Sequence, residues 1–128
     1  MSVELTMLVY STALLIVLVL IQATVGVQAQ GLQPMAGSRD DLPEPKPFQA
    51  RTKRVVDNHR EGLIMFAPVV LIAAVAHISN GATVLGAQLF FWSRLAYAPL
   101  YWLGITYLRT LAWLGGIVAM VMVLGSLL

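Results

Sequence analysis

Four polar residues that suit anion binding lie on one face of a helix near the middle of the chain. They are Arg51, Arg54, Asn58 and Glu61. With about 100° between successive residues of a helix, all four fall within an arc of about 80°. Guanidinium groups bind carboxylates and phosphates through paired N–H donors, so this pattern favours a cavity lined for an anionic ligand.

A second polar stripe runs along the same helix. Lys53, Asp57 and Arg60 share an arc of their own. A helix end at a membrane surface usually has one solvated face. Two polar stripes therefore indicate that one of them lines a cavity.

A second group of candidate residues lies about 40 positions further along the chain. Arg94, Tyr97 and Tyr101 have helical spacing and share one face, and Arg109 is followed by Thr110. Arg94 lies within an apolar segment. A charged residue inside a membrane span costs about 2.5–3.5 kcal/mol on the insertion scale, so it normally faces a partner or a water-filled cavity.

Glu61 is the only acidic residue of the two groups, and it can neutralise only one arginine. The surplus positive charge of Arg51, Arg54, Arg94 and Arg109 therefore calls for an anionic ligand. Two interpretations without a bound substrate stay open. Arg51 and Arg54 could be interfacial residues that contact lipid phosphates, and Glu61 could form an ion pair with Arg94.

The composition is that of an integral membrane protein. Of the 128 residues, 59% are hydrophobic and 11% are charged, whereas soluble domains have about 25% charged residues. The chain has no cysteine and its two histidines are far apart in sequence, so we expect no disulfide and no metal site. No basic run with interleaved aromatic residues is present, so we expect no nucleic-acid partner.

The elements that must position these residues are membrane-spanning helices. We expect a single all-α domain, 1–128, that forms a four-helix bundle with up-down topology. The alternating Pro43, Pro45 and Pro47 favour an extended loop. The expected spans are about 3–29, 48–79, 82–103 and 106–128, with a loop over 30–47.

Lysine and arginine set the expected orientation. The first loop and the start of the second span carry six of them, whereas the two termini carry none. The positive-inside rule then places the first loop in the cytoplasm and both termini on the other side. The first span has no basic leader and is too long for a signal peptide, so we expect it to be retained.

The two residue groups together resemble the signature of the MAPEG family, the membrane-associated proteins in eicosanoid and glutathione metabolism. The second span carries Arg51-x-x-Arg54-x-x-x-Asn58-x-x-Glu61. The later block is Arg94-x-x-Tyr97-x-x-x-Tyr101, followed by Arg109-Thr110. The resemblance covers nearly the whole chain.

The resemblance implies a homotrimer that binds glutathione as a co-substrate between neighbouring subunits, near the cytoplasmic face. Arg109 would be the catalytic residue, because a guanidinium group lowers the pKa of a nearby thiol. Glu61 would bind the ammonium group of glutathione, and three arginines would bind its carboxylates. The residues implied in glutathione binding are Arg51, Arg54, Asn58, Glu61, Arg94, Tyr97, Tyr101 and Thr110.

The resemblance leads us to expect a glutathione-dependent membrane transferase or peroxidase that conjugates or reduces lipophilic electrophiles, in a bacterial inner membrane. The first span has no arginine, unlike that of many members, and Tyr97 stands where some members have histidine. Two alternatives follow. The chain could be a non-catalytic accessory subunit of a larger membrane complex, or its polar cavity could bind an anionic lipid headgroup.

Overall fold

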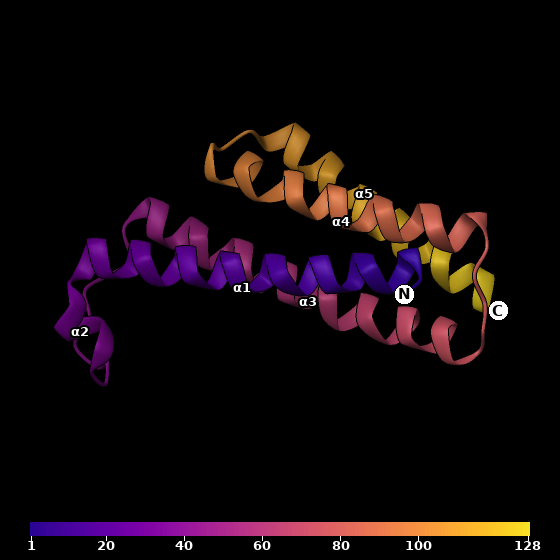
Figure 1. Ribbon diagram of the computed structural model, residues 1–128. Helices are drawn as coiled ribbons and strands as arrows, with labels where there is room; N and C mark the ends of the chain where they lie inside the picture. Colours follow the sequence, from indigo (N-terminus) through magenta and orange to yellow (C-terminus); the bar gives the residue numbers. More distant parts are fainter.

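The computed structural model describes residues 1–128 and contains only helices (Figure 1). The expected all-α fold of a helical membrane protein is confirmed. The helices are α1 (Val3–Gln30), α2 (Leu32–Ala36), α3 (Pro47–Val75), α4 (Gly81–Trp102) and α5 (Thr106–Leu127).

The four long helices alternate in direction, so the two ends of the bundle differ (Figure 1). Met1, Leu128 and the turn 76–80 lie at one end, which we call the terminal end. The connections 37–46 and 103–105 lie at the other, which we call the loop end. The up-down arrangement places both termini on the same side.

Side-chain caps begin two of the long helices. The Oγ atom of Ser2 accepts a hydrogen bond from the backbone N–H of Leu5, at 3.2 Å. The Oδ1 atom of Asn80 accepts from the N–H groups of Ala82 at 2.9 Å and Thr83 at 3.0 Å. These bonds satisfy N–H groups that have no partner within the helix.

The prolines have different effects according to their positions. Pro43 and Pro45 lie in the extended connection, and Pro47 begins α3, where a helix needs no N–H donor. Pro68 lies inside α3 without ending it. A membrane helix tolerates such a proline because groups of neighbouring helices can bond to the carbonyl oxygen that has lost its partner.

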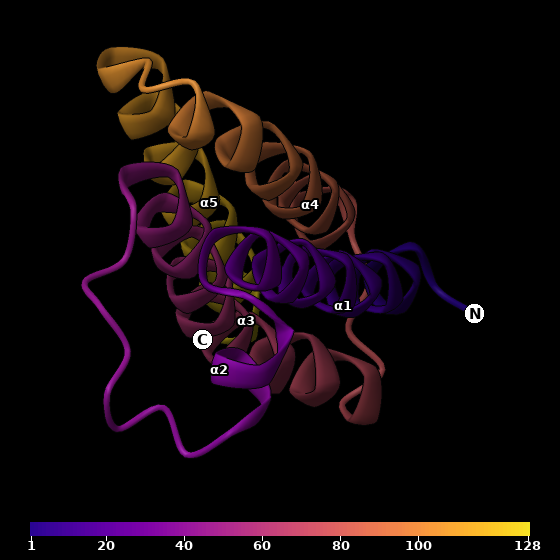
Figure 2. The same ribbon diagram turned by 90° about the vertical axis from the view of Figure 1, so that its left-hand side faces the viewer.

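The expected loop 30–47 contains the short helix α2, and the rest of the connection bows away from the bundle (Figure 2). Met35 of α2 lies close to Gly26 of α1, where a Cβ atom would come within 2.7 Å of the Met35 methyl group. The side-chain amide of Gln30 donates to that of Gln49 at 3.1 Å. The first contact holds α2 against α1, and the second joins the end of α1 to the start of α3.

The core has two apolar clusters along the bundle. The first is centred on Phe66 and Phe90, whose rings stack with centroids 3.9 Å apart. The second lies nearer the loop end and contains buried residues of α1, α3 and α4. Its members are Leu14, Leu18, Val55, Val56, Tyr97 and Ala98.

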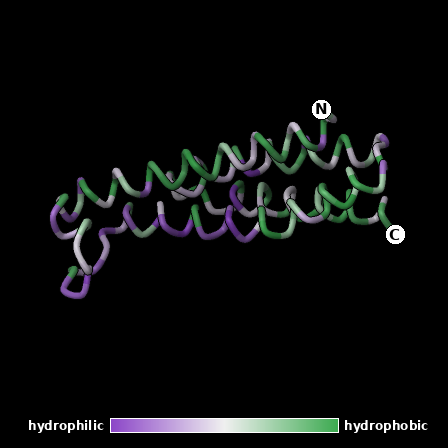
Figure 3. Tube along the Cα trace, turned by 60° about the horizontal axis from the view of Figure 1, so that its bottom comes forward, coloured by the Kyte–Doolittle hydropathy of each residue, from purple (hydrophilic) through white to green (hydrophobic).

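Three helices, α1, α3 and α5, are long and apolar enough to cross a membrane. α4 has 22 residues but lacks an equally apolar stretch of membrane-spanning length, because Gln88, Ser93 and Arg94 interrupt it. It packs most extensively against α5. Hydrophilic residues gather at the loop end and along the first half of α3, and the remaining helical surface is largely apolar (Figure 3).

Gly86 lies at a close contact between α4 and α5. A Cβ atom there would lie 2.9 Å from the carbonyl oxygen of Ala119 and 2.8 Å from a methyl group of Val123. We expect Gly86→Ala to separate the two helices and to lower the free energy of unfolding by about 1–3 kcal/mol. Thermal unfolding in detergent measures this loss.

Gly125 of α5 provides the matched control, because a Cβ atom there would meet no neighbouring atom within 4 Å. Gly125→Ala should leave the melting temperature unchanged or raise it slightly, since alanine favours helix. Equal melting temperatures for the two variants would show that α4 and α5 do not pack closely at Gly86.

Candidate functional site

Arg94 lies at the centre of the candidate site, between α3 and α5. Only 3% of its surface is exposed. A Cβ atom at Gly62 of α3 would lie 3.8 Å from its Nε atom, and one at Gly116 of α5 would lie 3.4 Å from its Cδ atom. The two glycines thus leave the space through which this long side chain passes.

The guanidinium group of Arg94 has two partners within the chain. Its Nη2 atom donates a hydrogen bond to Oδ1 of Asn58, and the group lies 4.7 Å from the centre of the Tyr97 ring. Its Nε atom is buried and has no hydrogen-bond partner. Because Oδ1 of Asn58 accepts from Arg94, the amide nitrogen of Asn58 is left to donate to another group.

A row of two tyrosine rings, with an arginine at each end, continues from Arg94 towards the loop end. The rings of Tyr97 and Tyr101 have centroids 5.6 Å apart. The guanidinium group of Arg109, from α5, lies 4.5 Å from the centre of the Tyr101 ring. Cation–π contacts of this kind stabilise a positive charge in a fixed place.

Two neighbouring cavities lie between α3, α4 and α5, and Asn58 and Trp113 line both of them. We call the two together the groove. The polar part, near the loop end, has a volume of about 490 Å³ and is also lined by Tyr97, Tyr101, Arg109 and Thr110. The deeper part has a volume of about 450 Å³. It is also lined by Glu61, Gly62, Met65, Phe90, Arg94, Gly116, Ile117 and Met120.

Arg51 and Arg54 do not line this groove. Nη1 of Arg51 donates to the carbonyl oxygen of Trp102 at 3.1 Å, so Arg51 caps the C-terminal end of α4. Arg54 is exposed and lines a separate cavity near α2 and the connection 37–46. The structure therefore separates the four residues of the first stripe, and only Asn58 and Glu61 lie in the groove.

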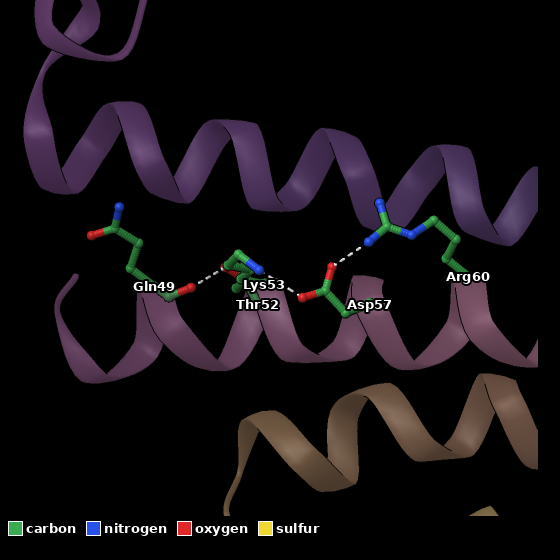
Figure 4. A network of polar contacts seen from close by, with 5 residues as sticks. All are labelled: Gln49, Thr52, Lys53, Asp57 and Arg60. Atoms are coloured by element: carbon green, nitrogen blue, oxygen red, sulfur yellow. Dashed lines mark hydrogen bonds and ion pairs between the residues drawn. The ribbon is translucent and has the colours of Figure 1, made fainter. Parts of the chain in front are cut away.

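The second stripe of α3 forms a local ion-pair network (Figure 4). Asp57 accepts from Lys53 at 2.7 Å and from Arg60 at 2.8 Å. These are the two ion pairs of the structure, so Glu61 forms none with Arg94. Glu61 is exposed at the edge of the groove and is free to bind a cationic group.

Several residues that line the groove were not among the expected site residues. Trp113 lies four positions after Arg109, and this spacing on one helix face could have predicted its place in the groove. Gly62 and Gly116 have no sequence signal that points to Arg94. His59 is buried, with its Nε2 atom 2.8 Å from the carbonyl oxygen of Ser11, so it joins α3 to α1 rather than the groove.

Fold and site together define a helical membrane protein with a groove of arginine, tyrosine and amide side chains near one end of its bundle. The model of the MAPEG family matches residues 7–128, which is nearly the whole chain. The chain belongs to the MAPEG family. No curated protein and no solved structure matches it.

Proposed function

We propose that the protein is a glutathione-dependent transferase or peroxidase that acts on lipophilic electrophiles. The observation that carries this proposal is the placement of Asn58, Tyr97, Tyr101 and Arg109 along one groove, where α3, α4 and α5 each contribute a side chain. Arginines flank the row of aromatic rings at both ends. Membership of the MAPEG family supports the same function.

Glutathione suits the charges of the groove. It has two carboxylates, one ammonium group and a thiol. In our proposal Glu61 accepts from the ammonium group, and Arg94 with the amide of Asn58 binds a carboxylate. The hydroxyl groups of Tyr97 and Thr110 supply further hydrogen bonds to the tripeptide.

Arg109 would act on the thiol. Its positive charge favours the thiolate, which is the nucleophilic form. The thiolate attacks an electrophilic carbon, a C–S bond forms, and the leaving group departs with its electron pair. With a hydroperoxide, the thiolate attacks the outer oxygen and the O–O bond breaks, so the sulfur becomes a sulfenic acid and the alkoxide leaves as an alcohol with the proton that the thiol gave up. A second glutathione then attacks the sulfenic sulfur, which forms the disulfide and releases water.

The apolar part of the groove would receive the electrophile. Met65, Phe90 and Trp113 line the deeper cavity beside Arg94. An apolar substrate dissolved in the bilayer loses little solvation when it enters such a space. The two cavities would then bring the thiolate and the electrophile together near Asn58.

We also propose a homotrimer in a bacterial inner membrane, with the loop end in the cytoplasm. Glu61 and Arg54 support an assembly, because both are exposed and neither has an ion-pair partner within the chain. The long helices also leave apolar side chains exposed, which either lipid or a neighbouring subunit would cover.

Calorimetric titration of the detergent-solubilised protein with glutathione tests the proposal. We expect saturable binding, and conjugation of glutathione to a chlorinated nitrobenzene. Arg60→Ala is the control, because Arg60 belongs to the exposed ion-pair network outside the groove. Absence of heat at millimolar glutathione would reject the proposed function.

A second candidate function, binding of an anionic lipid headgroup, is favoured by the separate cavity at the loop end. Arg39, Lys53 and Arg54 line it together with two glutamines, and it has no acidic residue in its lining. Phospholipid that co-purifies with the protein and is released by salt would support this function.

A further inference from the structure

A buried carboxylate lies at the terminal end of the bundle, far from the glutathione groove. Glu4 of α1 is 3% exposed. Its Oε1 atom accepts hydrogen bonds from the hydroxyl groups of Ser79 at 2.8 Å and Thr83 at 2.5 Å. Its Oε2 atom is buried and has no hydrogen-bond partner. One of the two carboxylate oxygens can therefore accept a further hydrogen bond.

No cationic side chain of the chain compensates the charge of Glu4. Both ion pairs of the structure involve Asp57. The first N–H groups of α4 donate to the side chain of Asn80 and not to Glu4. The N-terminal ends of α1 and α4 contribute only partial positive charges. A buried carboxylate without a counter-charge is costly, so this site favours a positively charged hydrogen-bond donor.

A cavity of about 580 Å³ adjoins Glu4. Its walls are mainly apolar side chains of α1 and α3, whereas Ser2, His77 and Ser79 provide its polar groups. The apolar lining residues are Leu5, Val70, Ala73, Ala74 and Ile78. A polar end beside apolar walls suits an amphiphile better than a bare metal ion, which needs about six oxygen ligands.

We propose that this cavity binds a protonated primary amine carried on an apolar chain. The ammonium group would donate one N–H to Oε2 of Glu4, and its remaining N–H groups would reach hydroxyl oxygens of Ser2 and Ser79. The apolar chain would lie along the walls. Because Oε2 is closed off from solvent, the carboxyl group must rotate to receive the ligand.

A ligand pair tests the proposal on the unaltered protein. Nanodiscs of phosphatidylcholine would contain the full chain, with either dodecylamine or dodecyltrimethylammonium added. Both ligands are positive and have the same chain, but the trimethylammonium group has no N–H donor. We expect native mass spectrometry to show dodecylamine bound at least tenfold more tightly, the usual effect of losing a charge-assisted hydrogen bond.

The same ammonium chemistry occurs in the headgroup of phosphatidylethanolamine, so a third nanodisc would contain this lipid. If the protein retains phosphatidylethanolamine in preference to phosphatidylcholine, the bound ammonium group belongs to a lipid headgroup. Binding of dodecylamine alone would identify a free alkylamine. If neither primary amine is preferred over its methylated counterpart, the proposal is overturned.

Glu4→Gln removes the charge and keeps the side-chain shape. We expect it to lower the affinity for dodecylamine about tenfold. Glu44→Gln is the matched control, since Glu44 is exposed in the connection at the loop end. If both variants bind equally, Glu4 is not the site. If Glu4→Gln fails to fold, the comparison of dodecylamine with dodecyltrimethylammonium on the unaltered protein still tests the proposal.

Discussion

Replacement of Arg109 with alanine should lower kcat/KM for glutathione conjugation by about 10²–10³-fold. This is the loss that follows when one group that stabilises a developing negative charge is removed from an active site. Arg109 lies over the Tyr101 ring, 4.5 Å from its centre, so its charge is directed into the groove. Initial rates with a chlorinated nitrobenzene measure the effect.

The pH dependence of the Arg109→Ala rate separates a catalytic role from a binding role. The guanidinium group lowers the pKa of the bound thiol, so its removal raises that pKa towards the value of free glutathione. The deficit should therefore be largest at neutral pH and shrink as the pH rises. A parallel loss at every pH would assign Arg109 to binding alone.

Arg60→Ala is the control for this experiment as well. Arg60 carries the same charge, but it bonds to Asp57 on the exposed stripe of α3. Its removal should leave the rate unchanged within about twofold, since exposed ion pairs contribute little. Equal rates for the Arg109→Ala and Arg60→Ala variants would contradict the proposed chemistry.

The overall architecture could be predicted because membrane helices are coded by simple local patterns. Long apolar segments separated by polar or turn-forming residues give the helices, and the short connections give their alternating directions. The helix α2 was not anticipated. Its five residues are too few for a periodic signal, and its Met35 contacts Gly26 on the preceding helix.

The site could be predicted only in part, because a helical wheel gives the direction of a Cα–Cβ bond and not the end point of a long side chain. Arg51 and Asn58 lie on the same predicted stripe. Arg51 nevertheless extends to the carbonyl oxygen of Trp102, a group left without a partner at the end of α4. Such acceptors depend on tertiary structure, which the sequence pattern does not contain.

Glu4 shows the same limit at the other end of the bundle. In the sequence it is an ordinary acidic residue in the first turn of a helix, a position that the helix dipole favours. Its burial depends on the turn between α3 and α4, which brings Ser79 and Thr83 over it. Glu4 lies 75 and 79 positions before Ser79 and Thr83, so no local sequence pattern predicts these contacts.

Arg94→Met should separate the stability of the fold from its function. Arg94 is buried and forms no ion pair, and its Nε atom has no hydrogen bond. A methionine would pass between Gly62 and Gly116 without a charge to desolvate. We therefore expect the melting temperature in detergent to stay the same or to rise, as when other buried charges are replaced by apolar side chains.

The same variant should bind glutathione on the order of 100-fold more weakly. Two contributions act together. A carboxylate of the tripeptide loses a charge-assisted hydrogen bond, which contributes about 1.5–3 kcal/mol. The amide of Asn58 also loses the donor that fixes its orientation. Calorimetric titration measures the affinity, and thermal unfolding of the same sample measures the stability.

The two measurements on Arg94→Met decide between two roles for this arginine. A stable protein with weak binding means that a buried charge is retained for its ligand at the expense of stability, as is common at functional sites. A destabilised protein with unchanged affinity would instead make Arg94 a packing element that joins α3, α4 and α5. Because its guanidinium group contacts Asn58 and Tyr97 within the groove, we expect the first result.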